Sequence, residues 1–187
     1  MDDAKPARAP GLGPCLLIAS PQMHDPHFER AVVLVWHHDA DGAIGVIINR
    51  MTEHTFPDVV SVDVDVHAYE DTLVGWGGPV ETGSGTVVTV GRVDEDDGWN
   101  LADGLAVTRS QETLTALIVA HAPLLLVLGY AGWSAGQLDK EISEGGWLWT
   151  DLSKHIVFDV PPEDRYDLAL AKLGVRSQDV WMRPISE

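Results

Sequence analysis

Short apolar runs separated by turn residues dominate the first half of the chain. Residues 15–19 are uniformly apolar and end at Ser-Pro, and residues 31–36 form a continuous β-branched run. Both patterns are typical of buried strands. The Asp/Gly loop 39–42 leads into a second apolar run at 43–48, so we predict an antiparallel hairpin. The runs 73–76 and 86–90 are predicted to form a second pair of strands across the glycine-rich stretch between them.

The second half of the chain has helical spacing. Thr108 and Gln111 have capping-box spacing, and the apolar residues that follow predict a helix that ends at Pro123. We then predict a central strand at 124–128, a helix at 136–144 and a further strand at 156–160. The last helix begins near Pro162 and ends at Gly174.

These elements predict one α+β domain at residues 15–176, because the strands arrive largely as hairpins and no linker or repeat divides them. Residues 1–14 contain charges and three prolines but no apolar stretch, which indicates a disordered tail without a signal peptide. Residues 177–187 form a C-terminal extension. Residues 56–67 allow two interpretations: Val60–Val66 alternate with polar residues as in a strand, whereas Phe56 and the residues after it are also compatible with a short helix.

The net charge narrows the classes of partner. Twelve Lys and Arg against 29 Asp and Glu give −17, a field that repels a polyanion, so we do not expect nucleic-acid binding. Such a surface is typical either of a solvated, soluble protein or of an acidic face for a basic partner or a cation. The longest apolar stretch is too short for a membrane span. The lone Cys15 excludes an intramolecular disulfide, and together these features favour a cytoplasmic protein.

Five segments resemble the YqgE/AlgH family of small bacterial proteins, which are sometimes labelled transcriptional regulators. The matching segments are Asp25-Pro-His-Phe28, Gly42 to Arg50 with its Asn-Arg ending, Gly77-Gly-Pro-Val80, Gly129 to Leu138, and Ile156-Val-Phe-Asp159 followed by Arg165, Tyr166 and Ala169. The resemblance implies an α+β fold with a mostly antiparallel, barrel-like, bifurcated β-sheet flanked by helices. It also favours the short helix near Phe56. It carries over no catalytic residues and no cofactor, and the chain has no recognition helix with outward Arg or Lys.

Metal-binding patterns in the chain are weak. His24, Asp25 and His27 lie before the predicted strand 31–36, and a second cluster at 37–39 lies after it. A strand of about eight residues separates the two clusters by about 25 Å at ~3.3 Å per residue, too far for one ion without another segment. The acidic run 94–97 before Gly98 fails the spacing of a calcium-binding EF-hand loop. We therefore predict no metal and no cofactor.

The stretch from Gly129 to Leu138 is the strongest candidate for a binding site. We interpret it as a turn before a helix, in which Gly132 and Gly136 expose backbone N–H groups toward a small anion. Tyr130 and Trp133 would wall the pocket, and Gln137 would orient a polar group. The alternative is a purely structural corner. The remaining candidate ligand- or partner-binding residues are Asp25, Asn49, Gly77 and Gly78.

The sequence thus leaves three hypotheses about function. The preferred one is a non-enzymatic binding or regulatory domain, a monomer or dimer, that acts through a protein partner or a small anionic ligand. The second is a hydrolase whose site combines Asp25, Asn49 and the corner at Gly129–Leu138. The third is a DNA-binding transcriptional regulator.

Overall fold

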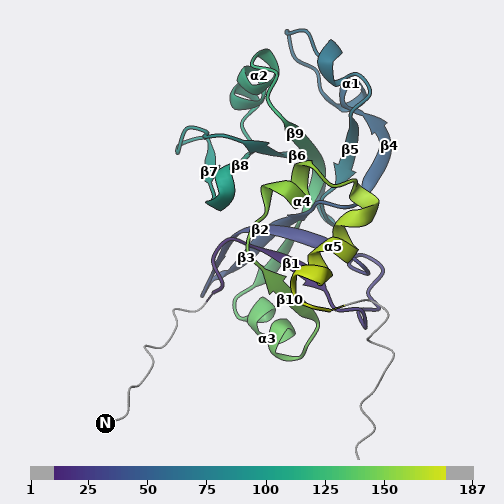
Figure 1. The fold of residues 1–187 in the computed structure, drawn as a ribbon. Coiled ribbons are helices and arrows are strands. Elements are labelled where there is room, and N and C mark those ends of the chain that lie inside the picture. The colour runs from purple at the N-terminus through teal and green to yellow at the C-terminus, as the bar shows by residue number, and fades with distance from the viewer. Residues whose placement is uncertain (1–10, 176–187) are drawn as a thin grey trace, which may run out of the picture.

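The computed structural model describes residues 11–175, so most of the predicted N-terminal tail and the whole predicted C-terminal extension lie outside the described residues. The chain folds as a single α+β domain around a curled sheet of ten strands (Figure 1). The strands are β1 (Cys15–Ala19), β2 (Val32–Asp39), β3 (Gly42–Ile47), β4 (Met51–Thr55), β5 (Leu73–Trp76), β6 (Val80–Val90), β7 (Gly98–Asn100), β8 (Leu105–Thr108), β9 (Leu124–Ser134) and β10 (Trp147–Thr150). The helices are α1 (Phe56–Val59), α2 (Gln111–Val119), α3 (Gln137–Ser143), α4 (Lys154–Phe158) and α5 (Arg165–Lys172), with short 3₁₀ turns η1 (His67–Tyr69), η2 (Ala102–Gly104) and η3 (Pro162–Asp164).

The sheet divides at β9, which confirms the bifurcated architecture. Val127 and Leu128 pair with β5 on one edge of β9 and with β6 on the other. Farther along, Ala131 and the residues after it pair with β3 instead of β5. The main path therefore runs β10-β1-β2-β3-β9-β6-β8-β7, while β4 and β5 form a side branch. All pairings are antiparallel except that between β5 and β9.

The predicted hairpin of residues 31–48 is confirmed as β2 and β3. The predicted second pair is wrong, because 73–76 and 86–90 do not pair with each other but lie on opposite edges of β9. The strand predicted at 156–160 is also wrong. Ser153 accepts a hydrogen bond from the Ile156 N–H and begins α4 there, so a β-branched run becomes helical.

The residues that cap α2 also differ from the prediction. Its N-cap is Ser110, whose hydroxyl accepts from the Thr113 N–H. Thr108 ends β8 instead, and its hydroxyl donates to the Asp97 carbonyl. The helix ends at Val119, before Pro123.

Of the two structures that the sequence allowed for residues 56–67, the short helix is present and the strand is not. Phe56–Val59 form the short helix α1, as the resemblance implied. The residues that follow form a loop that bends at Asp63 and Val64, and Val60–Val66 pair with no strand. Their valines are partly buried, and the polar residues between them are exposed.

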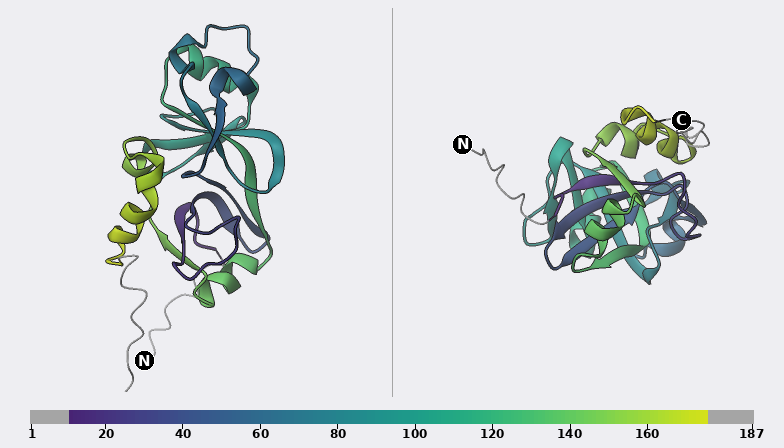
Figure 2. Two further views of the ribbon diagram at one scale, coloured as in Figure 1. Left: turned by 90° about the vertical axis from the view of Figure 1, so that its right-hand side faces the viewer. Right: turned by 90° about the horizontal axis from the view of Figure 1, so that it is seen from below.

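Two apolar clusters result from this division. The large one lies between the β10-β1-β2-β3-β9 part of the sheet and the helices α4 and α5, which cover one of its faces (Figure 2). The second cluster is centred on Phe56, Tyr69, Val74, Val87 and Ile118 and is covered by α1, the 60–66 segment and α2. No helix of the described chain is long and apolar enough to cross a membrane.

Candidate functional site

The glycine-rich stretch at 129–138 is mostly strand, so its interpretation as a turn is wrong over most of its length. β9 continues to Ser134, and only Ala135 and Gly136 lie between it and α3. Gly136 has a φ of 73°, the left-handed conformation that glycine adopts most easily. The helix α3 that follows has seven residues and carries Asp139 in its first turn.

Gly77, Gly78 and Gly129 lie where the sheet divides, and all three are buried. The Gly77 N–H donates to Leu128, and the Gly77 carbonyl accepts from the Ile47 N–H, so this residue links both branches. A Cβ atom on Gly78 would overlap the Tyr130 carbonyl, and one on Gly129 would overlap the carbonyl of Gly78. These glycines therefore allow two backbones to touch.

The polar groups around Trp133 form a closed network on α3. The indole N–H groups of Trp133 and Trp147 each donate to Oε2 of Glu141 at 2.9 Å. The other carboxylate oxygen accepts from the Gln137 amide, whose own oxygen accepts from Ser134. Both indoles are buried, so Glu141 satisfies donors that would otherwise be unpaired. Gln137 thus binds within the protein at both ends of its amide.

Asp25 and Asn49 hold the turn that precedes β2. The Asp25 carboxylate accepts from the His27 N–H, an Asx turn, and its carbonyl accepts from Phe28 and Glu29. The Asn49 oxygen accepts from the Val32 N–H at 2.9 Å, and its amide donates to the Arg30 carbonyl at 2.8 Å.

Two arginines reinforce this turn. Arg50 donates to the carbonyls of His27 and Glu29. Arg30, a non-glycine residue at a φ of 55°, places its guanidinium 4.5 Å from the centre of the Tyr166 ring. The segment is therefore a braced, strained turn.

The remaining candidates are also placed against protein atoms or open solvent. Tyr130 is half-buried beneath the guanidinium of Arg109, at 5.3 Å. Gly132 is exposed. Phe28 connects the turn before β2 with the hydrogen-bond network on α3. The centre of its ring lies 6.3 Å from that of Trp133 and 5.5 Å from that of Trp147. The structure thus joins the turn and the network through aromatic packing, without bringing together free polar groups.

The histidines singled out in the sequence have separate contacts. His27 stacks on Trp76, and His37 pairs with Asp39 at 2.8 Å. His38 is buried; its Nδ1 accepts from the Leu12 N–H, and Nε2 lies 3.3 Å from Asp139. Within residues 11–175, no three His, Cys, Asp or Glu side chains gather where they would hold a metal ion.

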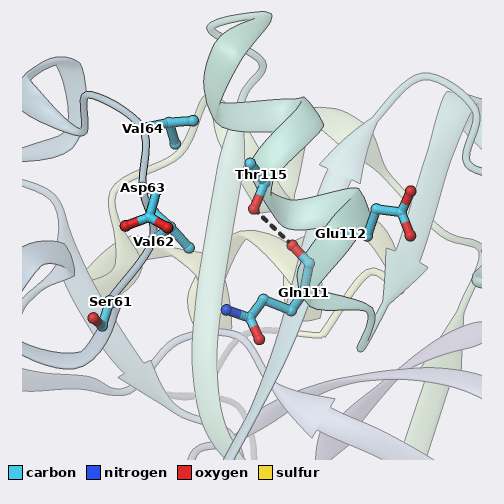
Figure 3. A pocket seen from close by; sticks show the side chains of 7 residues that line it. All are labelled: Ser61, Val62, Asp63, Val64, Gln111, Glu112 and Thr115. Carbon is cyan, nitrogen blue, oxygen red and sulfur yellow. Dashed lines mark hydrogen bonds between the residues drawn. The ribbon is translucent and has the colours of Figure 1, made fainter.

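A cleft lies elsewhere, between the 60–66 segment and α2 (Figure 3). Its volume is about 570 Å³, within the range of ligand-binding clefts. Val62 and Val64 point toward α2, from which Gln111 and Thr115 face the segment. We call it the acidic cleft; its lining residues are Ser61, Val62, Asp63, Val64, Gln111, Glu112 and Thr115.

The acidic cleft belongs to a lobe without fixed positive charge. We call residues 51–76 and 111–123 the acidic lobe; they contain no Lys or Arg. All of their carboxylates are exposed: Glu53, Asp58, Asp63, Asp65, Glu70, Asp71 and Glu112. The lobe lies at the opposite end of the molecule from α3, as both side views agree (Figures 1 and 2). Sequence reasoning missed this cleft, although the Val/Asp alternation and the lack of cations were its signals.

The class of protein that these features define is an α+β domain with a bifurcated sheet. Residues 16–178 match the model of the AlgH-like family. A UPF0301 protein of Bordetella petrii is 38% identical over 93% of this chain and 89% of its own length, and one of Rhodospirillum rubrum is 37% identical over 87% of each. The chain belongs to the AlgH-like family.

Solved structures of similar proteins agree with the fold. The solution structure of the AlgH protein from Pseudomonas aeruginosa has a TM-score of 0.75 and 33% identity, with both chains covered completely. The crystal structure of a Corynebacterium diphtheriae protein has a TM-score of 0.70 at 24% identity, over 89% of this chain and 87% of that one. This second likeness supports the fold alone.

Proposed function

We propose that this protein is a non-enzymatic binding domain with a regulatory role, and that it acts through a protein partner held at the acidic cleft. The cleft itself carries the proposal, because it combines the exposed carboxylates of Asp63 and Glu112 with the half-buried side chains of Val62 and Val64. Protein interfaces combine apolar anchors with a polar rim in this way.

The distribution of exposed apolar residues supports a macromolecular partner. Within the described chain, six large hydrophobic residues are exposed, and three of them, Val59, Leu73 and Val119, lie in the acidic lobe. Val119 is 63% exposed, the largest value of the six. Apolar surface that remains open to water around a cleft is typical of a docking site.

The other hypotheses receive less support. A hydrolase at Asp25, Asn49 and the Gly129–Leu138 stretch needs free groups that converge, whereas the Asn49 and Gln137 amides are engaged by the protein. A small anion near α3 would meet Asp139 and Glu141. Direct DNA contact would work against the −17 net charge.

Site-specific photo-crosslinking in living cells tests the proposal. A photoreactive amino acid at Ser61 or Thr115 is expected to give one discrete protein adduct, and the same group at Asp41, in the exposed β2–β3 turn, is the matched control. The partner, identified by mass spectrometry and purified, should then bind the wild-type protein and fail to bind a Thr115→Trp variant that fills the cleft. An adduct from Asp41 alone, or equal binding by the Trp variant, would contradict a partner at this cleft.

A further inference from the structure

His38 joins three elements from a buried position near the end of β2. Its side chain is only 1% exposed, and a Cβ atom on Gly11 would overlap its backbone carbonyl. The ring lies between two groups of opposite character: Nδ1 is 2.9 Å from the backbone nitrogen of Leu12, and Nε2 is 3.3 Å from the carboxylate of Asp139 on α3. We call residues 11–14, which lead into β1, the N-terminal strap. One imidazole therefore connects this strap to β2 and to α3.

The direction of these hydrogen bonds fixes the protonation state of the ring. A backbone N–H group can only donate, so Nδ1 of His38 must be an unprotonated acceptor. The single proton of the neutral ring is then on Nε2, where it faces a carboxylate oxygen of Asp139. The docked strap is thus compatible with the neutral imidazole, in one of its two tautomers.

A second proton on the ring would act on the two hydrogen bonds in opposite directions. In the imidazolium ion both nitrogens are donors, so the proton on Nδ1 would point at the Leu12 N–H and replace a hydrogen bond by a repulsive contact. The positive charge would at the same time strengthen the pair with Asp139. Protonation therefore weakens the attachment of the strap and keeps the attachment to α3.

The charged group beside the ring is Asp139, whose side chain is 46% exposed. On β2 itself, His37 and Asp39 pair with each other at 2.8 Å. Neither the strap nor β3 contains a titratable side chain. The response of the ring to acid therefore depends mainly on the Asp139 carboxylate. The other charged side chains of α3 have different partners: Lys140 and Glu141.

We propose that the N-terminal strap is a pH-sensitive device, docked through the neutral ring of His38 and released when that ring is protonated, while α3 stays in place. Imidazole is the side chain that ordinarily gains its proton near neutral pH, at about pH 6.5. Release removes the packing of Leu12 against the large apolar cluster and opens the end of β2 to water. This device is separate from the acidic cleft, since α3 and the acidic lobe lie at opposite ends of the molecule (Figures 1 and 2).

Hydrogen exchange measured against pH tests the release in the full-length protein. The protection factor compares each amide with the same amide in an unfolded chain at the same pH, so it removes the intrinsic pH dependence of exchange. From about pH 8 to about pH 5.5, the protection of the Leu12 amide should fall by up to about tenfold per pH unit, because release takes up one proton. Amides of α3 should keep their protection. Constant protection at Leu12, or an equal loss in α3, would overturn the proposal.

Replacement of the ring tests which residue carries the response. His38→Asn has no titratable group and places an amide oxygen near the position of Nδ1, so the Leu12 amide should stay protected at every pH in this range. The matched control His37→Asn removes an exposed imidazole of the same strand and should respond like the wild type. A pH response that survives in His38→Asn, or disappears in His37→Asn, would contradict the assignment to His38.

Replacement of Asp139 tests the charge pair without changing the buried core. Asp139→Asn removes the negative charge that favours the imidazolium ion, so the midpoint of release should move to lower pH by roughly half a unit. Asp139 is half-exposed, so this variant is informative even where His38→Asn does not fold. Glu144→Gln changes the net charge equally at an exposed site after α3 and should leave the midpoint unchanged. A midpoint that does not move in Asp139→Asn, or that moves equally in both variants, would overturn the proposal.

Discussion

At the scale of single residues, several polar side chains of the candidate region make hydrogen bonds within the protein. The Asn49 side chain accepts from the Val32 N–H and donates to the Arg30 carbonyl. Glu141 accepts from two buried indoles and from Gln137. A buried donor that loses its acceptor costs the full desolvation of that group, so these hydrogen bonds contribute to the stability of the fold.

The role of Asn49 can be measured by its removal. Asn49→Ala leaves the Val32 N–H, at the buried start of β2, without an acceptor, and should lower the free energy of unfolding by about 1–3 kcal/mol. Asn49→Asp keeps the acceptor and loses only the bond to the Arg30 carbonyl, so its loss should be smaller. Urea denaturation followed by circular dichroism measures both. An unchanged urea midpoint for Asn49→Ala would mean that its hydrogen bonds do not stabilise the fold, and that the side chain is available to bind a ligand.

Cys15 should be chemically silent in the native protein. Its thiol is buried in β1, and burial raises its pKa from 9.0 to about 12. At pH 8, Ellman's reagent should react slowly with the native protein and at once in urea, with Cys15→Ala as the blank. Because the raised pKa favours the neutral thiol, its contribution to stability is complete below pH 9 and is lost as pH rises toward 12. Rapid native reaction would indicate an accessible thiolate.

At the scale of elements, the position of a glycine decides its role. Gly78, buried with a φ of 153°, touches the Tyr130 backbone where the sheet divides. Gly132 lies on the same strand as Tyr130 but is exposed, and a Cβ there would meet only the Tyr130 ring at 3.6 Å. Two glycines from the same candidate site thus differ in what they tolerate.

Alanine at these two positions should change the free energy of unfolding by different amounts, because Gly78 is buried in the framework and Gly132 lies on the surface. Gly78→Ala adds backbone strain and overlap and should cost roughly 2–5 kcal/mol. Gly132→Ala should leave the free energy of unfolding unchanged or raise it by up to about 1 kcal/mol, because it restricts the unfolded chain. Thermal and urea unfolding of both variants provide the comparison. A large loss at Gly132 would contradict this division of roles.

Which elements the sequence predicts depends on how local their cause is. The β2–β3 hairpin is predicted because its turn residues lie inside it. The strand β9 was cut short at Leu128, since Gly129 resembles a stop until its close approach to Gly78 is known. α4 was missed because Ile156 and Val157 favour strand and the capping Ser153 was overlooked. A long-range backbone contact therefore explains the error at β9, and a helix N-cap explains the error at α4.

The candidate site follows the same rule. The polar residues of the Gly129–Leu138 stretch were found, but their engagement within α3 depends on Trp147 and Glu141, which the sequence did not connect to them. The acidic cleft needs α2 to lie against a segment about fifty residues earlier in the chain. The Val/Asp alternation at 60–66 was visible, whereas the absence of a pairing strand was not.

At the scale of the whole molecule, the well-packed framework and the exposed acidic lobe lie in different parts of the fold. The large apolar cluster, the braced turn before β2 and the α3 network form one continuous framework. The second cluster supports the acidic lobe at the other end of the molecule (Figure 2). Binding and catalytic residues alike are often carried on surface segments positioned by such a scaffold.

The most direct test maps where the partner identified by crosslinking contacts the protein. The ¹H–¹⁵N spectrum of the labelled protein should show dose-dependent shifts for the amides of residues 61–65 and of α2 upon titration. Amides of residues 25–31 and of the Gly129–Leu138 stretch should stay within experimental error. Shifts centred on Trp133 and Gln137, with the acidic lobe unchanged, would contradict our assignment of framework and binding surface.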